Sequence, residues 1–271
     1  SFWVLGDSLS AYVGEPGGAG TARASDGPLW SEQIVNDFRH AGQEAESFAV
    51  GGATAGLQRT NPVDPTAPFD LTSQVDRLLQ EAPRFGRKPI VSLWIGGNDI
   101  GAFSMGLPVA DSIAAYSSAL GRLVGAGVND LLLFEVPDIG FTPLLQDPSS
   151  PLDPTAASAG SAALNAVFFD LVVAGLPSTV DVKRINTFDL TKTAFTNPGF
   201  FGAAAAGPCT FDRVSLADCT QTTFWDPFHP TAILHDFVAN EVRAAGVTPV
   251  PLPAAAWMLL SALGGMILMR R

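Results

Sequence analysis

Positive charge is scarce in this sequence of 271 residues. It has 15 lysine and arginine residues against 26 aspartate and glutamate residues, and its formal net charge is −11 at pH 7. Proteins that bind phosphate backbones rely on an excess of lysine and arginine. We therefore expect no nucleic-acid partner.

Histidine and cysteine are also rare, with three histidines and two cysteines in the whole chain. Neither residue type accompanies Asp7 or Asp99 at the spacing of metal ligands, so we expect no metal site. The glycine-rich stretch Gly14–Gly20 lacks the Gly-Lys-Ser/Thr ending of a phosphate-binding loop. The sequence pattern therefore suggests neither a metal site nor a phosphate-binding loop.

Charge is absent altogether from Leu252 to Met269, an apolar run of 18 residues that Arg270 and Arg271 follow. As a helix this run would be about 27 Å long, close to the ~30 Å hydrocarbon core of a bilayer. The two arginines would stay on the cytoplasmic side and place the rest of the chain across the membrane. A buried terminal helix is the alternative. The sequence thus predicts a folded domain at 1–246, a proline-rich linker at 247–253 and a transmembrane helix at 254–271.

Cys209 and Cys219 lie about ten residues apart in a segment of loop-like composition. In an oxidising compartment they would close a disulfide loop that contributes up to roughly 3 kcal/mol in the chain-entropy model. Two unpaired thiols are the alternative, and the predicted export across the membrane favours the disulfide. No base stands near either cysteine at a suggestive spacing, so neither is expected to act as a nucleophile.

Short apolar runs alternate with amphipathic segments along the first 246 residues. This alternation is typical of βαβ units with a parallel sheet covered on both faces. Two stretches rich in Pro, Gly, Thr and Asn interrupt it, and we expect a surface loop at 58–69 and a functional loop or lid at 186–224. The expected strands are 2–5, 46–50, 90–95, 131–136 and 180–185, and the expected helices are 29–41, 71–81, 109–125, 155–174 and 231–245.

Ser8 follows the first predicted strand, at the end of which ligands bind in open parallel sheets. A serine hydroxyl is a weak nucleophile until a base, most often a histidine, takes its proton. His40 is expected at a helix end and His235 on the last helix, in a partly buried or surface position. His229, held between two prolines, is the expected base, and Asp226 three residues earlier can orient its ring. An N-cap role for Ser8 and a turn-capping role for Asp226 are the structural alternatives.

Attack on an ester leaves negative charge on the carbonyl oxygen, which needs hydrogen-bond donors. Gly52 follows a predicted strand and can present its backbone N–H, with Gly51 as the less favoured register. Asn98 stands in a Gly-Gly-Asn-Asp turn after another strand and can offer its side-chain amide. Together with the N–H of Ser8 they make a candidate oxyanion hole. A strand-ending turn is the structural alternative for each glycine pair.

These segments together resemble the SGNH/GDSL hydrolase family. The matching blocks are Gly6-Asp7-Ser8-Leu9-Ser10, Ala49-Val50-Gly51-Gly52-Ala53-Thr54, Gly96-Gly97-Asn98-Asp99 and Asp226-Pro227-Phe228-His229-Pro230-Thr231, in the family's order. The resemblance implies a flavodoxin-like three-layer α/β/α sandwich, with Ser8, Asp226 and His229 as the catalytic residues. It assigns the oxyanion hole to Ser8, Gly52 and Asn98. The Gly-x-Ser-x-Gly elbow of α/β-hydrolases is not matched, because the second glycine is missing.

The segment Val250-Pro251-Leu252-Pro253-Ala254-Ala255, with the apolar run and two arginines after it, resembles the PEP-CTERM sorting signals of Gram-negative bacteria. Leu252 stands where those signals usually have glutamate. The resemblance implies processing by an exosortase and display at, or release from, the cell surface. A secretory signal is expected to have been removed before Ser1 or to lie outside this numbering.

The leading prediction is a secreted or surface-anchored carboxylic ester hydrolase that cleaves lipid or other acyl esters through an acyl-enzyme on Ser8. Such acyl transfer needs no cofactor. Two alternatives remain: an acyltransferase of the same family, and a non-catalytic surface or biofilm matrix protein that retains the fold. The acyl length, the alcohol of the substrate and the oligomeric state are left open by the sequence.

Overall fold

Five parallel strands form the centre of the molecule in the computed structural model, which describes residues 1–15, 23–56, 70–86, 88–104, 108–210 and 219–250. The strand order is β2-β1-β3-β4-β5, and every neighbouring pair is parallel. This order is the one found in flavodoxin-like folds. The predicted α/β fold class is therefore confirmed. The strands are β1 (Phe2–Gly6), β2 (Ala45–Ser47), β3 (Ile90–Trp94), β4 (Asp130–Phe134) and β5 (Asp181–Ile185).

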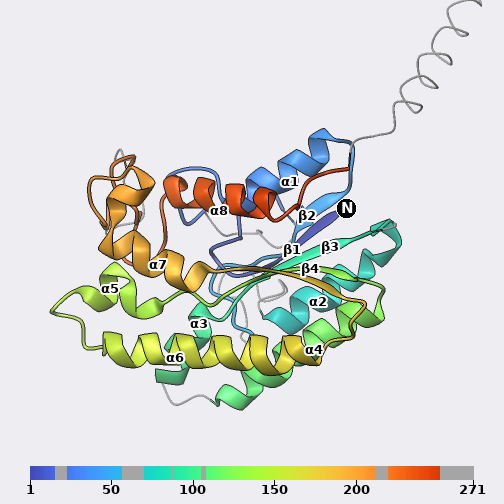
Figure 1. Cartoon of the computed structure of the whole chain (residues 1–271), viewed down its shortest axis with the longest axis horizontal. Coiled ribbons are helices and arrows are strands. Elements are labelled where there is room, and N and C mark those ends of the chain that lie inside the picture. Colours follow the sequence, from blue (N-terminus) through green and yellow to red (C-terminus); the bar gives the residue numbers. More distant parts are fainter. Residues whose placement is uncertain (16–22, 57–69, 87, 105–107, 211–218, 251–271) are drawn as a thin grey trace, which may run out of the picture.

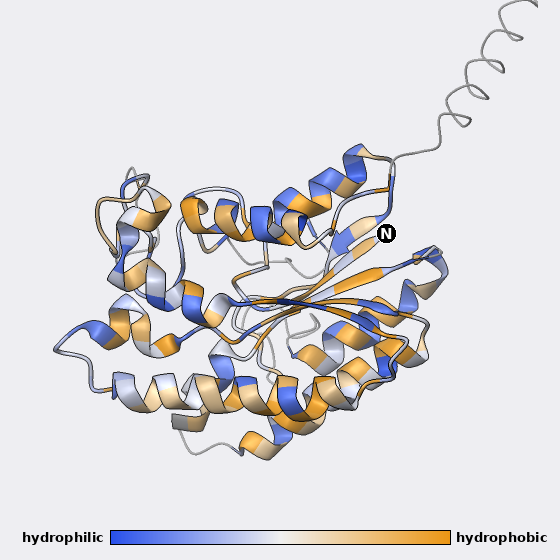
Figure 2. Cartoon of the chain, in the orientation of Figure 1, coloured by the Kyte–Doolittle hydropathy of each residue, from blue (hydrophilic) through white to orange (hydrophobic). Residues whose placement is uncertain are grey.

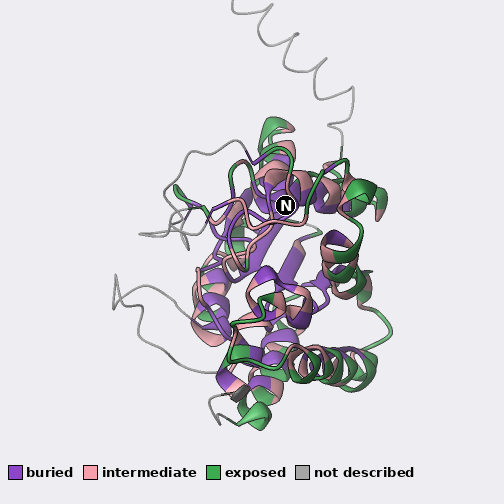
Figure 3. Ribbon diagram, turned by 90° about the vertical axis from the view of Figure 1, so that its left-hand side faces the viewer, coloured by how far each residue is buried: buried purple, intermediate pink, exposed green. Residues whose placement is uncertain are grey.

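The central strands are apolar because both of their faces are covered. Every residue of β1 is buried, and so are four of the five residues in β3 and in β4; Figure 3 shows this buried interior. The edge strand β5 differs, since Asp181 and Arg184 are exposed on it. Charged residues on an edge strand discourage pairing with another chain.

Helices cover the sheet in two layers (Figure 1). The helices α1 (Trp30–His40) and α8 (Ala232–Ala244) lie on one face, and α2 (Leu71–Gln80), α4 (Val109–Gly125) and α6 (Pro154–Ala166) lie on the other. Their apolar residues turn toward the strands (Figure 2) and form a separate hydrophobic cluster on each side of the sheet. The three-layer sandwich expected from the sequence is thus the observed architecture.

The stretch 186–224, expected as a functional loop or lid, contains two helices that were not predicted. They are α7 (Thr187–Thr196) and the short helix η5 (Pro198–Phe201). The side chain of Asn186 caps α7 by accepting a 2.9 Å hydrogen bond from the Asp189 N–H. Polar caps of this kind stabilise a helix whose apolar periodicity is weak. The sequence reading also missed α3 (Gly97–Ser104), α5 (Pro143–Gln146), η1 (Ala82–Arg84) and η2 (Ile139–Phe141).

The helix predicted at 155–174 continues past α6 as η3 (Val167–Val172) and η4 (Val173–Gly175). Within the described residues, Pro154–Gly175 is long and apolar enough to cross a membrane by length and composition alone. Leu164, Phe168 and Phe169 are nevertheless buried in the cluster beneath the sheet, as in a helix that covers a domain core. The predicted surface loop at 58–69 and the predicted membrane helix at 254–271 lie outside the described residues.

Candidate active site

Ser8 stands in the tight turn that follows β1. Gly6 has a φ of +154°, and a Cβ there would lie 2.4 Å from the Trp94 carbonyl oxygen, so only glycine fits this close approach. The buried side chain of Gln74 forms two hydrogen bonds to Gly6. It accepts from the Gly6 N–H and donates to the Gly6 carbonyl, each at 2.8 Å. No helix starts at Ser8, which is only partly buried. An N-cap role for Ser8 is therefore excluded.

His229 and Asp226 complete a continuous chain of hydrogen bonds from Ser8. The Ser8 Oγ lies 2.8 Å from His229 Nε2, and His229 Nδ1 lies 2.9 Å and 2.8 Å from the two Asp226 carboxylate oxygens. Burial acts to raise the pKa of Asp226, but hydrogen bonds from the His229 ring and from two backbone N–H groups outweigh it and lower the pKa. The carboxylate is thus charged at neutral pH, which favours the Nδ1–H tautomer of His229 and leaves Nε2 free to accept from Ser8.

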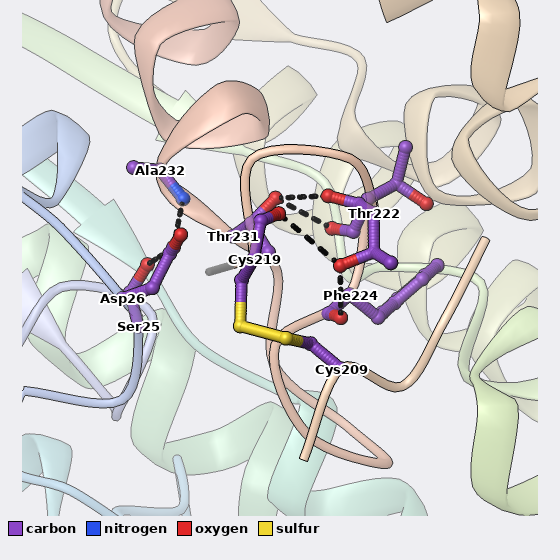
Figure 4. The surroundings of a disulfide bond; sticks show 9 residues. Ser25, Asp26, Cys209, Cys219, Thr222, Phe224, Thr231 and Ala232 are labelled. Atoms are coloured by element: carbon purple, nitrogen blue, oxygen red, sulfur yellow. Dashed lines mark hydrogen bonds between the residues drawn. A yellow bond between two sulfur atoms is a disulfide. The ribbon is translucent and has the colours of Figure 1, made fainter. Parts of the chain in front are cut away.

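The loop that carries His229 is braced on several sides. The carbonyl of His229 accepts from the Trp225 N–H at 2.8 Å, and the Thr231 hydroxyl donates to the Thr222 carbonyl at 2.7 Å. Cys209 and Cys219 form a disulfide beside this network (Figure 4). The Cys209 N–H also donates to the Phe224 carbonyl at 3.0 Å. The bond between the two cysteines therefore fastens the segment that leads into the His229 loop.

Asp26 supports the first turn of the helix that follows this loop. Its carboxylate accepts from the Ala232 N–H at 2.7 Å, at the N-terminus of α8 (Figure 4). A carboxylate at this position satisfies an unpaired N–H and interacts favourably with the helix dipole. The start of α8, two residues after the Pro230 that flanks His229, is thus tied to the segment just before α1.

The two further candidate oxyanion donors follow β2 and β3, the two strands that flank β1 in the sheet. Gly52 has a φ of +79°, which favours glycine, and both Gly51 and Gly52 line the cavity next to Ser8. Asn98, at the start of α3, also lines the cavity and donates through Nδ2 to the Ala53 carbonyl at 2.9 Å. An amide nitrogen carries two N–H groups. This bond fixes the orientation of the amide and leaves its second N–H for a ligand.

Two more carboxyl groups, those of Asp7 and Asp99, are buried next in sequence to the candidate oxyanion donors Ser8 and Asn98. Burial, together with the negative charge of Asp99, raises the pKa of Asp7 to about 7, although Asp7 Oδ1 accepts a 3.0 Å bond from the Leu9 N–H. Burial also raises the pKa of Asp99, whose carboxylate accepts from the Ser112 hydroxyl and the Ala55 N–H. Both accept hydrogen bonds as predicted from the sequence, but only Asp7 lies in a turn, because Asp99 belongs to the first turn of the helix α3. Among the described residues no cluster of His, Cys, Asp and Glu could hold a metal ion.

The Ser8 and His229 side chains open into one large cavity of about 1190 Å³ at the carboxyl ends of the strands. Drug-sized ligands occupy cavities of roughly 300–1,000 Å³, so this space accommodates a substrate of substantial size. Most of its wall is apolar and comes from both helix layers. On the α3 and α6 side the wall includes Ile100, Phe103, Ile139, Leu145 and Ala157, and on the α7 and α8 side it includes Leu190, Phe224, Leu234 and Val238.

The other two histidines, His40 and His235, differ in their burial. His40 is exposed at the end of α1, in the position expected for it. His235 was expected in a partly buried or surface position, but it is completely buried in the cavity wall. Helical spacing explains the difference, because His235 lies three and seven positions before Val238 and Val242, on the face of α8 that packs on the sheet. The same spacing could have revealed its burial in the sequence.

Comparison with known proteins agrees with this geometry. The model of the GDSL-like lipase/acylhydrolase family matches residues 3–242. A phosphatidylcholine-sterol acyltransferase of Aeromonas hydrophila is 27% identical in an alignment 269 residues long. The alignment covers 79% of this chain and 77% of that protein. Lipase 1 of Photorhabdus luminescens is 29% identical over 164 residues, which cover 54% of this chain but 24% of that protein.

A solved structure of an acetyl xylan esterase shares the fold. It superposes with a TM-score of 0.50 at 17% identity, over 90% of this chain and 99% of that chain. The family match extends over nearly all of the described domain and includes the blocks that carry Ser8, Gly52, Asn98 and His229. The chain therefore belongs to the GDSL-like lipase/acylhydrolase family and is a carboxylic ester hydrolase, as its sequence predicts.

Proposed function

We propose that the protein cleaves carboxylic esters through an acyl-enzyme on Ser8. The observation that carries this proposal is the continuous chain from the Ser8 hydroxyl through His229 to the Asp226 carboxylate, with contacts of 2.8–2.9 Å. His229 Nε2 takes the hydroxyl proton as Ser8 attacks the ester carbonyl. The charged Asp226 stabilises the imidazolium that forms.

The tetrahedral intermediate then collapses with the proton moving from His229 to the leaving alcohol. Its oxyanion is bound by the N–H groups of Ser8 and Gly52 and by the second amide N–H of Asn98. Water enters next, loses its proton to His229 and releases the acid from Ser8. Each proton that His229 accepts is returned in the same half-reaction, so the cycle restores the starting state.

The shape of the cavity supports esters with an apolar acyl part. The wall from α3 and α6 includes the apolar residues Ile100, Phe103 and Ala157, and burial of apolar surface contributes roughly 25 cal/mol per Å². We place the acyl chain along this wall. Lipids and other acyl esters are the substrate class that this arrangement favours.

The proposal is tested by hydrolysis of p-nitrophenyl esters from acetate to palmitate with wild type and Ser8→Ala. Ser118→Ala is a matched control, because Ser118 is an exposed serine on α4. Activity should vanish in Ser8→Ala and persist in Ser118→Ala, and the preferred chain length should separate an esterase from a lipase. Equal rates in wild type and Ser8→Ala would contradict the serine mechanism, and no hydrolysis at any chain length would favour an unusual substrate or a role in surface display.

Acyl transfer to an alcohol is the second candidate function. Its specific support is the similarity to the phosphatidylcholine-sterol acyltransferase over most of both chains. The same acyl-enzyme would then react with a hydroxyl of an acceptor in place of water. Incubation with a phospholipid and a sterol or glycerol acceptor should yield acylated acceptor, and free fatty acid as the sole acyl product would rule this function out.

We further propose that the protein is exported and anchored through residues 254–271, and then displayed at or released from the cell surface by an exosortase-type enzyme. The apolar run before Arg270 and Arg271 and the Pro251-Leu252-Pro253 motif support this proposal, as does the Cys209–Cys219 disulfide, since such bonds persist in oxidising compartments. Mass spectrometry of the exported protein should show a new C-terminus near residues 250–254. An intact Arg271 on that form would contradict the processing step.

A further inference from the structure

Phe228 presents exposed aromatic surface in the wall of the catalytic cavity. It lines the same cavity as Ser8 and His229, and it is 39% exposed. The other phenylalanine and tryptophan residues that line this cavity in the described part of the chain are buried or partly buried: Trp94, Phe103, Phe224 and Trp225. Their apolar surface is mostly covered by the protein itself, whereas Phe228 retains apolar surface that a ligand can cover.

The Phe228 ring lies beside the ring of the catalytic base. The centroids of the Phe228 and His229 rings are 6.4 Å apart, in an edge-on arrangement with an angle of 65° between the two planes. His229 Nε2 in turn lies 2.8 Å from the Ser8 Oγ. One imidazole ring therefore separates Phe228 from the nucleophile.

The backbone that carries the Phe228 ring is held by hydrogen bonds. The Phe228 N–H donates to Asp226 Oδ1 at 2.7 Å, and the Pro227 carbonyl accepts from the Leu144 N–H at 3.0 Å. Pro227 also has a fixed φ. A surface that is positioned before binding loses less conformational entropy when a ligand covers it. The location of Phe228 in the cavity wall is thus set before a substrate arrives.

The chemistry of ester cleavage decides which part of a substrate reaches Phe228. His229 Nε2 delivers its proton to the oxygen of the leaving alcohol, which must then lie about 3 Å from that nitrogen. The carbon atoms of the alcohol lie one or two bonds further, and apolar groups are in contact at about 4.0–4.5 Å. The alcohol part is therefore within reach of the Phe228 ring. In the proposed binding mode the acyl chain follows the wall from α3 and α6.

On the basis of the proposed ester hydrolysis, we propose that the Phe228 ring is the binding surface for an apolar alcohol part of the substrate. Contact between apolar carbon and exposed aromatic surface is favourable, whereas a polar group in the same place loses water without gaining a hydrogen-bond partner. The preferred substrates are then esters whose alcohol carries an apolar ring or branched chain close to the ester oxygen. Phe228 acts in recognition and exchanges no proton.

Three esters of one acid test this assignment: the methyl ester, the cyclohexylmethyl ester and the tetrahydropyran-4-ylmethyl ester. The last two have rings of the same size and differ in one ether oxygen, and the methyl group is too short to cover the Phe228 ring. The acid is the one cleaved fastest in the p-nitrophenyl series, and its release is followed in a pH-stat with the full chain. Wild type should have a higher kcat/KM for the cyclohexylmethyl ester than for its ether counterpart.

Phe228→Ala removes the ring and keeps the backbone N–H of residue 228. It should lower the kcat/KM for the cyclohexylmethyl ester, relative to that for the methyl ester, about two- to tenfold, as expected for one aromatic contact. The change should lie mainly in KM. Phe228→Leu retains an apolar side chain and should recover part of this ratio. Phe200→Ala, the same change at an exposed phenylalanine that does not line the cavity, is the matched control and should leave the ratio unchanged.

A purely structural role of Phe228 has a different signature. If the ring only supports the loop of His229, Phe228→Ala lowers kcat for all three esters alike, and this outcome would overturn the proposal. Equal cleavage of the two ring esters by wild type, or an unchanged ratio in Phe228→Ala, would overturn it as well. Cleavage of the methyl ester without any such preference leaves the proposed hydrolysis intact, whereas no cleavage of any ester contradicts both.

Discussion

Two buried aspartates, Asp226 and Asp7, lie in two segments near Ser8, and their pKa values are shifted in opposite directions. The loop before α8, residues 225–231, holds Asp226 with N–H donors from Phe228 and His229, each at 2.7 Å, and with the His229 ring. The turn after β1, residues 6–10, holds Asp7 with a bond from the Leu9 N–H and with the negative Asp99 nearby. The pKa of Asp226 is lowered and that of Asp7 is raised to about 7.

The difference follows the charge that each side of the site must support during the reaction. Positive charge develops on His229, and an ionised carboxylate beside it is stabilising. Negative charge develops near Gly52 and Asn98, where an ionised carboxylate would repel it. Asp7 lies on that side, close to Gly97. One residue type therefore performs two roles, and the extent of its burial, its hydrogen-bond donors and its neighbouring charges decide which.

Substitution of each aspartate by asparagine tests this comparison directly, and Asp226→Asn should have the largest effect. The amide no longer stabilises the imidazolium or selects the Nδ1–H tautomer of His229, so kcat should fall by roughly 10⁴-fold, as at other Ser-His-Asp sites. Steady-state hydrolysis of a p-nitrophenyl ester at pH 7 measures the loss. Asp7→Asn should retain most of the activity in the same assay, and an equal loss in both variants would remove the distinction.

Asn98→Ala is expected to have the next largest effect, on the oxyanion side of the site. Removal of one oxyanion donor typically lowers kcat by about 10²–10³-fold. KM should change little, because the lost bond forms in the transition state. Asn129→Ala is a suitable control, since Asn129 is an exposed residue far along the chain. A rise in KM at unchanged kcat would instead indicate that Asn98 binds the substrate ground state.

Gln74→Leu should weaken the turn that carries both Ser8 and Asp7. The change leaves the Gly6 N–H and carbonyl without the side-chain partners observed at 2.8 Å, and the free energy of unfolding should fall by about 2–4 kcal/mol. Gln80→Leu makes the same change at an exposed position of the same helix. Urea denaturation compares the two, and equal stability would show that other contacts hold the turn.

Asp7→Asn should change how stability depends on pH. The raised pKa means that the folded state binds the Asp7 proton more tightly than the unfolded state, for which the ordinary value is 3.8. Its contribution to stability is therefore greatest below about pH 4 and is lost as the pH rises to about 7.

Asparagine cannot ionise, so the variant should gain stability relative to wild type between pH 5 and pH 8, on the order of 2 kcal/mol. Urea denaturation at the two pH values measures this difference. Asp170→Asn, at an exposed aspartate, serves as the control and should show no such gain. A constant difference between Asp7→Asn and wild type at both pH values would show that Asp7 is ionised in the folded state throughout.

The sequence predicted the roles of residues 6–10 and 225–231 because these segments contain recognisable strand ends or rigid turn residues. Buried runs such as Phe2–Leu5 and Ile90–Ile95 identified the parallel sheet, and the turns after them held Ser8 and Asn98. The helix α7 was missed because its residues are mostly polar and its start depends on the Asn186 cap. The Gln74 bonds to Gly6 were invisible for another reason, since they join residues 68 positions apart.

Labelling with a fluorophosphonate probe, followed by peptide mass spectrometry, tests the assignment of the nucleophile most directly. The hydrogen-bonded chain from Ser8 to Asp226 predicts one adduct, on the peptide that contains Ser8, with loss of activity in proportion to labelling. Ser8→Ala should remain unlabelled and His229→Ala should label slowly. An adduct on another residue, or full activity in protein that is fully labelled, would contradict the mechanism.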